Sequence, residues 1–411
     1  MSKQNCVIIG ASHAAAQLAL SLRQGGWEGR IQVIGDEPGL PYQRPPLSKD
    51  VLAGAKTAEA IVIRPAALYE KSDIEFAFGR RVVQIDRASK LLKLDDGASL
   101  HYDKLALTLG SRARAIPLRG SDQEGIFYLR TLADVLQIRP FVAGGKRAVI
   151  VGGGYIGLEA AAVLRKLGME VTVIEALPRV LQRVTAAEVS SFYERIHGEE
   201  GVRILTETVV SSIAGSGRVE QVVCVDGTEY EADLVIIAVG IVPNVELAEE
   251  AGLQVDNGIT VDEYTRTSDP DIVAAGDCTC HFNPFYQRLI RLESVQNAND
   301  QAKTAAATLN GRLEPYRALP WFWSEQYDVK LQIAGLSQGY DNVVLRGNPD
   351  EGRSFAVFYF AGDRLLAVDA VNRPAEFMTA KRLLIQGSAV NREKLADDKL
   401  SVKELLPDQP G

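Results

Sequence analysis

A glycine-rich stretch near the middle of the chain has the spacing of a phosphate-binding turn. Residues 152–157 read Gly-Gly-Gly-Tyr-Ile-Gly and stand between an apolar run and a helical pattern. In such a turn Gly152 permits the bend, Gly154 lets the backbone approach a pyrophosphate, and Gly157 allows close packing of the helix. The positive end of that helix, which is predicted to begin at Tyr155, meets the phosphate charge. The pattern predicts a dinucleotide site.

An acidic residue follows this turn at the distance that a ribose requires. Glu175 lies eighteen residues beyond Gly157, at the end of the next apolar run. A carboxylate there accepts hydrogen bonds from the 2′-hydroxyl of NADH and repels the 2′-phosphate of NADPH. Arg179 and Arg183 follow it. As cations they could soften the preference for NADH, but they could equally contact the diphosphate or face solvent. The sequence therefore favours NADH, with Arg183 as a further candidate cofactor contact.

A degraded copy of the same turn stands at the N-terminus. Residues 10–15 read Gly-Ala-Ser-His-Ala-Ala, so Gly10 keeps the bend while Ser12 and Ala15 replace the second and third glycines. Asp36 ends the next apolar run and takes the ribose position. A later Gly276-Asp277 follows another short apolar strand and has two interpretations, a further cofactor contact or a plain strand-turn.

Both turns lie in strand-turn-helix-strand patterns, which indicates an internal duplication. The first copy predicts strands at 6–9 and 31–34 around a helix at 14–23, and the second predicts strands at 148–151 and 171–174 around a helix at 155–167. Asp96-Gly97 with an apolar strand ending at Gly110 is repeated as Asp226-Gly227 with a strand ending at Gly240. The repeat is typical of an antiparallel β-meander inserted before the last parallel strand.

The remaining sequence predicts a third, α+β domain from residue 319. An aromatic run stands at 321–323 and is followed by strand-like runs at 327–334, 355–360 and 365–371. Pro374 opens a helix at 375–385. The charged tail after Asn391 is expected to be a frayed terminus. The fold class is α/β, with two Rossmann-like dinucleotide-binding domains and a C-terminal α+β domain. The domains are predicted at 1–110 with 242–318, at 111–241 and at 319–411.

Composition excludes several classes of protein. The chain has 411 residues, enough for two to three domains, and its 45 basic and 53 acidic residues give a net charge of −8. Such a charge argues against nucleic acid or an anionic membrane as partner. The apolar run after Met1 is too short for a signal peptide or a membrane span. We expect a cytoplasmic protein, as a monomer or weak homodimer.

Cysteine and histidine are placed so that they exclude other chemistries. No Cys-x-x-Cys pair occurs, and residues 37–56 hold no cysteine, although disulfide reductases with two dinucleotide sites carry a Cys-x4-Cys pair there. Reducing equivalents must then leave without a thiol relay. The chain has four histidines, at His13, His101, His197 and His281. They have neither metal-ligand spacing nor a Ser-His-Asp arrangement, so we predict no metal site and no hydrolase site.

Several motifs together resemble one family over essentially the whole chain. They are the opening glycine turn, Pro-Pro-Leu-Ser-Lys at 45–49, Gly-Gly-Gly-Tyr-Ile-Gly-Leu-Glu at 152–159, Gly-Asp-Cys at 276–278, Glu-Ser-Val at 293–295 and Pro-Trp-Phe-Trp-Ser at 320–324. The chain resembles the FAD-dependent, NADH-oxidising ferredoxin reductases of oxygenase systems, of the putidaredoxin reductase type. These are two-dinucleotide flavoproteins of glutathione-reductase-like fold.

The resemblance implies a set of cofactor residues. The implied FAD contacts are Gly10, Ser12, Ala14, Ala15, Asp36, Lys49, Val82, Arg130, Asp277, Val295 and Trp323. The implied NADH contacts are Gly152, Gly154, Ile156, Gly157, Glu175, Arg183 and Gly240. By the same resemblance, Lys49 and Glu159 meet beside the flavin ring, where the ammonium stabilises the reduced flavin. The alternative is a solvated lysine and a glutamate on a helix surface. Without the family, Trp321 and Trp323 would be core residues.

The function implied is electron transfer from NADH through FAD to a two-iron ferredoxin that supplies a monooxygenase. One alternative is an NADH-dependent reductase of rubredoxin or of a small organic radical. Another is a redox-gated binding flavoprotein, although a pI near 5.3 argues against a DNA-binding one. Because ferredoxins of this kind are usually acidic, a local basic patch is expected among Arg64, Arg80, Arg81, Arg288, Arg291, Arg312 and Arg317.

Overall fold

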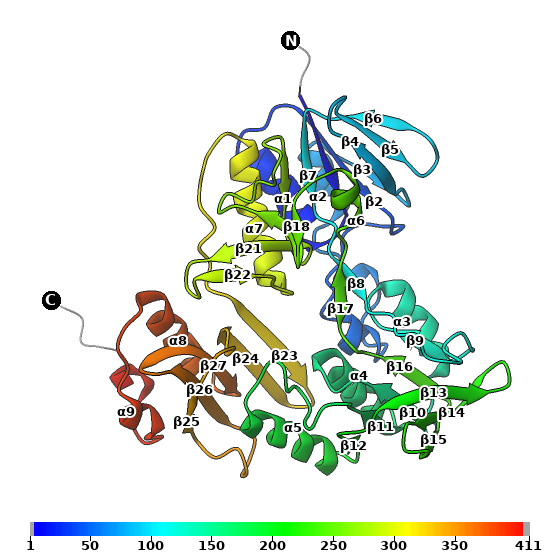
Figure 1. The fold of residues 1–411 in the computed structure, drawn as a ribbon, viewed down its shortest axis with the longest axis vertical. Helices are drawn as coiled ribbons and strands as arrows, with labels where there is room; N and C mark the ends of the chain where they lie inside the picture. The colour runs from blue at the N-terminus through cyan, green and yellow to red at the C-terminus, as the bar shows by residue number, and fades with distance from the viewer. Residues whose placement is uncertain (1–3, 406–411) are drawn as a thin grey trace. The chain divides into compact units, whose positions relative to one another are not determined.

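The computed structural model describes residues 4–405, whose backbone is drawn in Figure 1. The chain forms two compact units. The first unit comprises residues up to 43, 57–112 and 241–318, and the second comprises 44–56, 113–240 and 319 onward. Strands β8 (Ser111–Ala113) and β17 (Ile241–Pro243), which carry the chain out of the first unit and back, form a two-stranded sheet. The division into three folding domains stays a prediction.

The first unit contains a five-stranded parallel sheet in the order β20-β7-β1-β2-β3. Its strands are β1 (Asn5–Ile9), β2 (Arg30–Gly35), β3 (Ile74–Phe78), β7 (Lys104–Leu107) and β20 (Ile272–Ala274). Strand β1 is apolar and buried from Cys6 to Ile9, as expected for a parallel strand covered on both faces. Helix α1 (His13–Gln24) follows β1 and packs against α7 (Val295–Leu309). The predicted strand-helix-strand unit is confirmed.

The second unit repeats this sheet with the order β12-β11-β10-β16-β9. Its strands are β9 (Ile126–Tyr128), β10 (Arg147–Val151), β11 (Glu170–Ile174), β12 (Arg203–Leu205) and β16 (Leu234–Ile237). Helix α4 (Tyr155–Lys166) follows the central strand, as α1 does in the first unit. In each sheet the strand before the glycine turn lies between the next strand along the chain and a later one. The internal duplication is confirmed. Each glycine turn lies at the point where the strand order of its sheet reverses, which is where α/β sheets bind ligands.

Each parallel sheet is accompanied by the predicted antiparallel meander. One consists of β4 (Val82–Asp86), β5 (Leu91–Leu94) and β6 (Ser99–His101), the other of β13 (Val210–Gly215), β14 (Val219–Cys224) and β15 (Glu229–Glu231). Gly97 and Gly227 share a φ of 85°, which favours glycine, in the turns before β6 and β15. Asp96 and Asp226 each accept a hydrogen bond from the amide two residues on.

Shorter elements complete the parts around the sheets. In the first unit they are η2 (Glu59–Ile61), α2 (Ala66–Lys71), α6 (Glu246–Glu250), and the sheet of β18 (Val255–Asp256), β19 (Gly258–Val261), β21 (Thr279–Asn283) and β22 (Arg288–Ile290). In the second unit they are η1 (Leu47–Val51), α3 (Leu132–Ile138), η3 (Arg139–Phe141) and α5 (Ala187–Glu199). Over residues 4–405, no helix combines the length and the apolar character needed to cross a bilayer.

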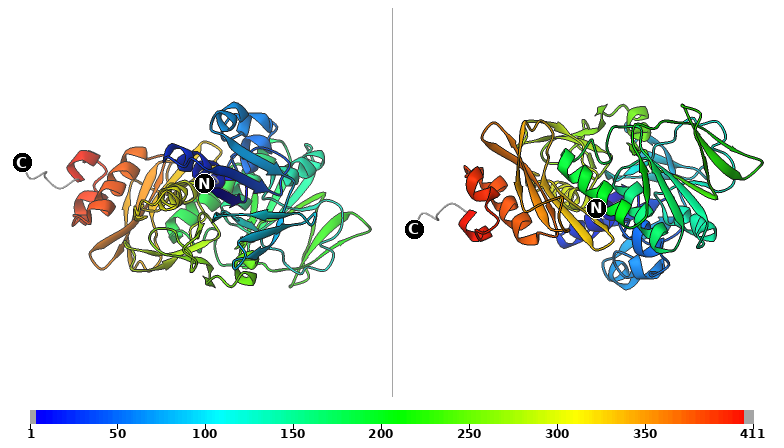
Figure 2. Two further views of the ribbon diagram at one scale, coloured as in Figure 1. Left: turned by 90° about the horizontal axis from the view of Figure 1, so that it is seen from above. Right: turned by 90° about the horizontal axis from the view of Figure 1, so that it is seen from below.

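An antiparallel sheet in the order β23-β24-β27-β26-β25 forms the C-terminal part of the second unit. Its strands are β23 (Trp321–Gln326), β24 (Val329–Gly335), β25 (Asn342–Arg346), β26 (Phe355–Ala361) and β27 (Arg364–Val371). Helix α8 (Pro374–Gln386) packs against β24 and β27 on one face of it (Figure 2). The predicted helix and its proline start are confirmed. Tyr327, expected in a strand, instead occupies the β23–β24 turn with a φ of 57°.

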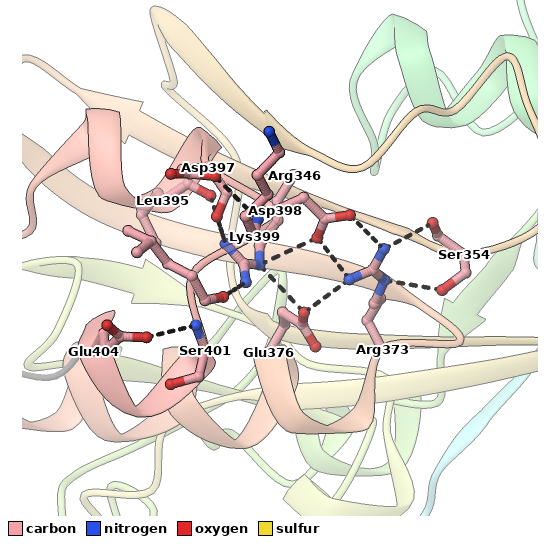
Figure 3. A network of polar contacts seen from close by, with 11 residues as sticks. Arg346, Ser354, Arg373, Glu376, Leu395, Asp397, Asp398, Lys399, Ser401 and Glu404 are labelled. Carbon is pink, nitrogen blue, oxygen red and sulfur yellow. Dashed lines mark hydrogen bonds and ion pairs between the residues drawn. The ribbon is translucent and has the colours of Figure 1, made fainter.

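The segment after Asn391 is ordered, so the prediction of a frayed tail is wrong up to residue 405. It forms α9 (Arg392–Ala396) and η4 (Val402–Leu405). Buried Arg346 donates to the backbone carbonyls of Leu395 and Asp397, as Figure 3 shows. It also donates to the carbonyl of Leu400. Its guanidinium also pairs with Glu376 at 3.3 Å. One buried cation thus binds the tail through its main chain, an interaction that charge alternation in the sequence does not reveal.

Candidate functional site

The second glycine turn has the geometry of a diphosphate cradle. Gly152 adopts a φ of 112°, and a Cβ added there would lie 2.5 Å from the carbonyl oxygen of Ala238. A Cβ on Gly157 would lie 2.1 Å from the carbonyl oxygen of Gly152, whereas one on Gly154 would meet nothing within 4 Å. Gly154 caps α4 without a side chain, and the first turn of α4 has no acidic residue. The helix N-terminus and the open space beside it fit an anion.

Glu175 is held against this turn by two backbone amides. Its Oε2 accepts from the Gly153 amide at 2.7 Å and its Oε1 from the Leu177 amide at 2.8 Å. Arg179 donates to Ser190 Oγ and to the carbonyls of Gln182 and Thr185, so it fixes the following loop. Other predicted NADH contacts nearby are exposed or unobstructed: Ile156, Arg183 and Gly240. The fixed carboxylate is suited to bind a ribose.

The first glycine turn keeps the bend with fewer glycines. Gly10 has a φ of 102°, and a Cβ there would lie 2.2 Å from the carbonyl oxygen of Thr108. Ser12 is the extended N-cap of α1, whose first turn also lacks an acidic residue. Ala14 and Ala15 are buried in that turn. Asp36 follows β2, is largely exposed and pairs with Arg81 at 3.0 Å. This end of the first unit fits a second dinucleotide.

The loop at Gly276-Asp277 is fixed by a polar cluster that the sequence did not indicate. Buried Gln301 on α7 accepts through Oε1 from the Gly276 amide at 2.8 Å and from Thr279 Oγ1 at 2.9 Å. Its Nε2 lies 3.2 Å from Nδ1 of His281, whose pKa burial lowers to about 4. Asp277 accepts from Ser111 Oγ at 2.8 Å. A polar residue on the inner face of α7 is the only sequence signal for this cluster.

Two more predicted FAD contacts lie in ordinary surroundings of the first unit. Val82 begins β4 and is buried, and Val295 begins α7 after the N-cap Ser294. Arg130 and Trp323, by contrast, belong to the second unit with Lys49. Arg130 precedes the capping box of α3, and its carbonyl accepts from Arg44 at 3.0 Å. Trp323 is half-buried in β23.

The structure brings Lys49 and Glu159 together in the second unit. Lys49 Nζ lies 2.6 Å from Glu159 Oε2, and Glu159 is 3% exposed, so the interpretation as a solvated lysine and a surface glutamate is wrong. Ser48 Oγ donates to Oε2 at 2.5 Å and Ser324 Oγ to Oε1 at 2.7 Å. Lys49 itself has non-helical backbone angles within η1. A buried carboxylate with these donors fixes the ammonium in one position.

The four thiols are unsuited to redox chemistry at neutral pH. All are buried and free: Cys6, Cys224, Cys278 and Cys280. Burial raises the pKa of Cys6 to about 12 and that of Cys278 to about 11, and it also raises the pKa values of Cys224 and Cys280. Since the thiolate is the reactive form, these cysteines are inert. Within residues 4–405 no group of His, Cys, Asp and Glu side chains forms a metal site.

Known proteins share both parts of this chain. The family model described as pyridine nucleotide-disulphide oxidoreductase matches residues 4–302, and the one described as reductase C-terminal matches residues 321–406. Putidaredoxin reductase CamA of Pseudomonas putida is 44% identical, over 98% of this chain and 97% of the relative. Rhodocoxin reductase of Rhodococcus erythropolis is also 44% identical, over 97% and 93%.

Two further comparisons bear on the electron acceptor. The solved covalent putidaredoxin reductase–putidaredoxin complex contains a chain of 44% identity that superposes with a TM-score of 0.96, over 98% of both chains. A rubredoxin-NAD(+) reductase of Pseudomonas putida is 37% identical, over 90% of this chain and 96% of the relative.

Proposed function

The chain belongs to the pyridine nucleotide-disulphide oxidoreductase family, in its branch of NADH-dependent, FAD-containing ferredoxin reductases, and we propose that it reduces a two-iron ferredoxin that supplies a monooxygenase. The observation that carries this proposal lies in residues 37–56. Where related disulfide reductases have reactive cysteines, this segment contributes Lys49, paired with the buried Glu159. Electrons therefore have a charged pair but no thiol on their route.

Each residue group has a role that follows from its surroundings. The N-terminus of α1 and Asp36 would hold the diphosphate and ribose of FAD, and the N-terminus of α4 and Glu175 those of NADH. When bound at these residues, FAD would supply the conversion of a hydride from NADH into single electrons, which NADH alone does not provide. Lys49 supplies a fixed positive charge for the negative charge that reduction creates, and Glu159 fixes Lys49.

The second candidate acceptor is a rubredoxin, favoured by the identity to a rubredoxin reductase. Stopped-flow reduction of the FAD-loaded protein by NADH, followed by addition of either a two-iron ferredoxin or a rubredoxin, distinguishes the two, with cytochrome c as final acceptor. We expect rapid bleaching of the flavin absorbance and faster onward transfer to the ferredoxin. Faster transfer to rubredoxin would reverse the assignment, and an unreduced flavin would refute both.

Two attributes of the working protein remain part of the proposal. We place it in the cytoplasm, because its four thiols are free and reduced there. We also propose a monomer or weak homodimer, which sedimentation of the FAD-loaded protein over a range of concentrations tests.

A further inference from the structure

We propose that His197 and Gln326 are positioning residues for this reaction, because they act through Ser324 to hold Glu159 and so fix the charge of Lys49. The inference rests on the proposed function in one respect, the role of the Lys49–Glu159 pair beside FAD. Neither residue was singled out by its sequence motif, and each is far from Glu159 in the chain. The structure joins them by a continuous line of hydrogen bonds within the second unit.

The line begins at the β23–β24 turn and ends at Glu159. Tyr327 OH lies 3.0 Å from His197 Nδ1, and His197 Nε2 lies 2.8 Å from Gln326 Oε1. Gln326 Nε2 donates to Ser324 Oγ at 3.2 Å, and Ser324 Oγ donates to Glu159 Oε1 at 2.7 Å. His197 and Ser324 are 0% exposed and Gln326 is 2% exposed. Water therefore does not compete for the bonds among His197, Gln326, Ser324 and Glu159, so each of these groups depends on its neighbour, whereas Tyr327 is only partly buried.

The direction of every hydrogen bond follows from the Glu159 end. A carboxylate only accepts, so Ser324 must donate its single proton to Glu159 and must accept from Gln326. The Gln326 amide nitrogen therefore faces Ser324, and its oxygen accepts from His197. His197 must then carry its proton on Nε2 and accept from Tyr327 on Nδ1. All four donors point toward the carboxylate, and they supply a directed dipole in addition to the two bonds from Ser48 and Lys49.

The outer end is fixed, and His197 keeps one charge state. Burial lowers the pKa of His197 to about 4, against smaller opposing effects of Gln326 and Glu200, so the ring is neutral at pH 7. Tyr327 also faces Glu200, Arg165 and Arg353. Arg353 pairs with Glu200 at 3.0 Å and with Asp328 in the same turn, which holds Tyr327 in place. At the inner end, Tyr155 and Tyr193 face Glu159.

Packing alone does not account for this arrangement. Apolar side chains of similar volume commonly stabilise a core as well as a buried polar network does. A fully satisfied network adds what apolar packing lacks, namely a defined orientation at its end. Here that end is the carboxylate that holds Lys49, so His197 and Gln326 are placed to influence the reaction without touching a cofactor.

Three variants of the FAD-loaded full chain separate positioning from packing. Gln326→Glu keeps the size of the side chain but replaces a hydrogen-bond donor to Ser324 by an acceptor. The Ser324 hydroxyl then donates to the new carboxylate and no longer to Glu159. His197→Phe removes the donor to Gln326. His197→Gln is the matched control, because a glutamine amide nitrogen reaches the place of Nε2 and restores the donor. The readouts are the limiting rate of flavin reduction by NADH against pH, the KM for NADH, and the infrared carboxylate stretching bands of Glu159, which report its hydrogen bonds.

We expect Gln326→Glu and His197→Phe to lower the limiting rate by about tenfold, the effect of one lost buried hydrogen bond, and to shift its pH profile. The KM for NADH should stay within about twofold, because the bond lost is not a substrate contact. His197→Gln should match the wild type. In 15N-histidine-labelled protein, His197 should show the Nε2–H neutral form. A His197→Gln as slow as His197→Phe, or both variants with unchanged rates and infrared spectra, would overturn the proposal.

The infrared and NMR measurements need no ferredoxin and no NADH. They therefore still report the state of Glu159 and His197 if the wild-type protein fails to reduce a ferredoxin. That failure would refute the proposed function while leaving the hydrogen-bonded line to be judged by its spectra.

Discussion

The carboxylate of Glu175 is oriented by the backbone of the protein itself. Each of its two oxygens accepts a hydrogen bond from a backbone amide, and one of these amides belongs to Gly153 in the glycine turn. A fixed negative charge favours a ribose hydroxyl and repels a phosphate at the same place. Selection between NADH and NADPH is then a property of one side chain and two amides.

Glu175→Ala should lose this selection by about 1–3 kcal/mol, the value of a hydrogen bond to a charged group. The ratio of kcat/KM for NADH to that for NADPH measures it, and Glu175→Gln serves as the control that keeps size without charge. A wild-type protein that used both nucleotides equally would show that Glu175 has another role.

A protein without cysteine should still pass electrons. Each thiol is buried with a raised pKa, so none supplies a thiolate at neutral pH. Replacing all four cysteines by alanine or serine should leave flavin reduction and ferredoxin reduction nearly intact in stopped flow. A folded, FAD-loaded variant that reduced its flavin but not ferredoxin would indicate a thiol on the route.

At the scale of an element, the α4 turn separates folding from binding. A Cβ on Gly154 meets open space, whereas one on Gly157 collides with the carbonyl of Gly152. Gly154→Ala should therefore keep the unfolding temperature while filling the space for a diphosphate, and it should raise the KM for NADH by roughly tenfold or more. Gly157→Ala should lose about 1–3 kcal/mol of stability through overpacking.

Gly198 in α5 supplies the control for these two variants. It lies within a regular helix, and a Cβ there meets nothing within 4 Å. Gly198→Ala should gain up to about 1 kcal/mol from helix propensity and leave the KM for NADH unchanged. Equal effects of Gly154→Ala and Gly198→Ala on NADH binding would contradict the assignment of the turn.

Elements with local signals were predictable from the sequence, and long-range polar contacts were not. The duplicated strand-turn-helix units and the Asp-Gly turns depend on apolar periodicity and on glycine at fixed positions. These signals are local in the sequence, and the structure confirms the elements that they predict. The partners of Glu159 come from Ser48 and Ser324, 111 and 165 residues away. Without the family resemblance, nothing near Glu159 indicates its burial. The ordered tail escaped prediction because its contacts run through main-chain oxygens to Arg346.

For the whole molecule, two buried histidines and one buried aspartate contribute to how stability varies with pH. His197 and His281 have pKa values lowered from 6.5 to about 4, so the unfolded chain binds protons that the folded chain refuses between these values. Stability should fall as pH drops through this window, by about 1.4 kcal/mol per pH unit for each histidine. Burial raises the pKa of Asp369 from 3.8 to about 7, which has the opposite slope.

Urea unfolding of the apoprotein against pH checks these signs. His197→Gln should flatten the loss of stability between about pH 6.5 and pH 4, because one proton uptake by the unfolded chain is removed. Between about pH 4 and pH 7 the folded chain holds a proton on Asp369 that the unfolded chain releases, which makes stability fall as pH rises. Asp369→Asn removes this opposing contribution, so stability should rise more steeply with pH over the same range. Variants with the same pH slope as the wild type would mean that these groups titrate normally.

Ferredoxin docking should depend on salt despite the net charge of −8. Of the seven arginines predicted for a basic patch, Arg80, Arg81, Arg291 and Arg312 form ion pairs with acidic residues. Arg64 and Arg317 are exposed and show no ion pair among residues 4–405. Exposed charges are screened beyond about 8–10 Å at ordinary salt, so ferredoxin reduction should weaken with ionic strength while flavin reduction by NADH changes little.

Charge reversal at the two unpaired arginines tests the patch directly. Arg64→Glu and Arg317→Glu should each reduce the apparent association with ferredoxin, and Arg80→Glu, at an ion-paired site, is the comparison. Stopped-flow rates of both half-reactions give the answer. Ferredoxin reduction that ignores salt and both reversals would mean docking by apolar contacts.

The way Arg346 binds the C-terminal tail has a consequence for how this chain tolerates mutation. The guanidinium contacts the main-chain oxygens of Leu395, Asp397 and Leu400, and every residue has such an oxygen. Side chains at 397 and 400 are therefore open to drift, while Arg346 itself has no substitute that offers the same set of donors. A saturation library across residues 392–405 should show broad tolerance except at the buried Leu395 and Leu405 and at Asp398, whose carboxylate pairs with Arg373 and Arg346. Arg346 itself should tolerate almost no substitution.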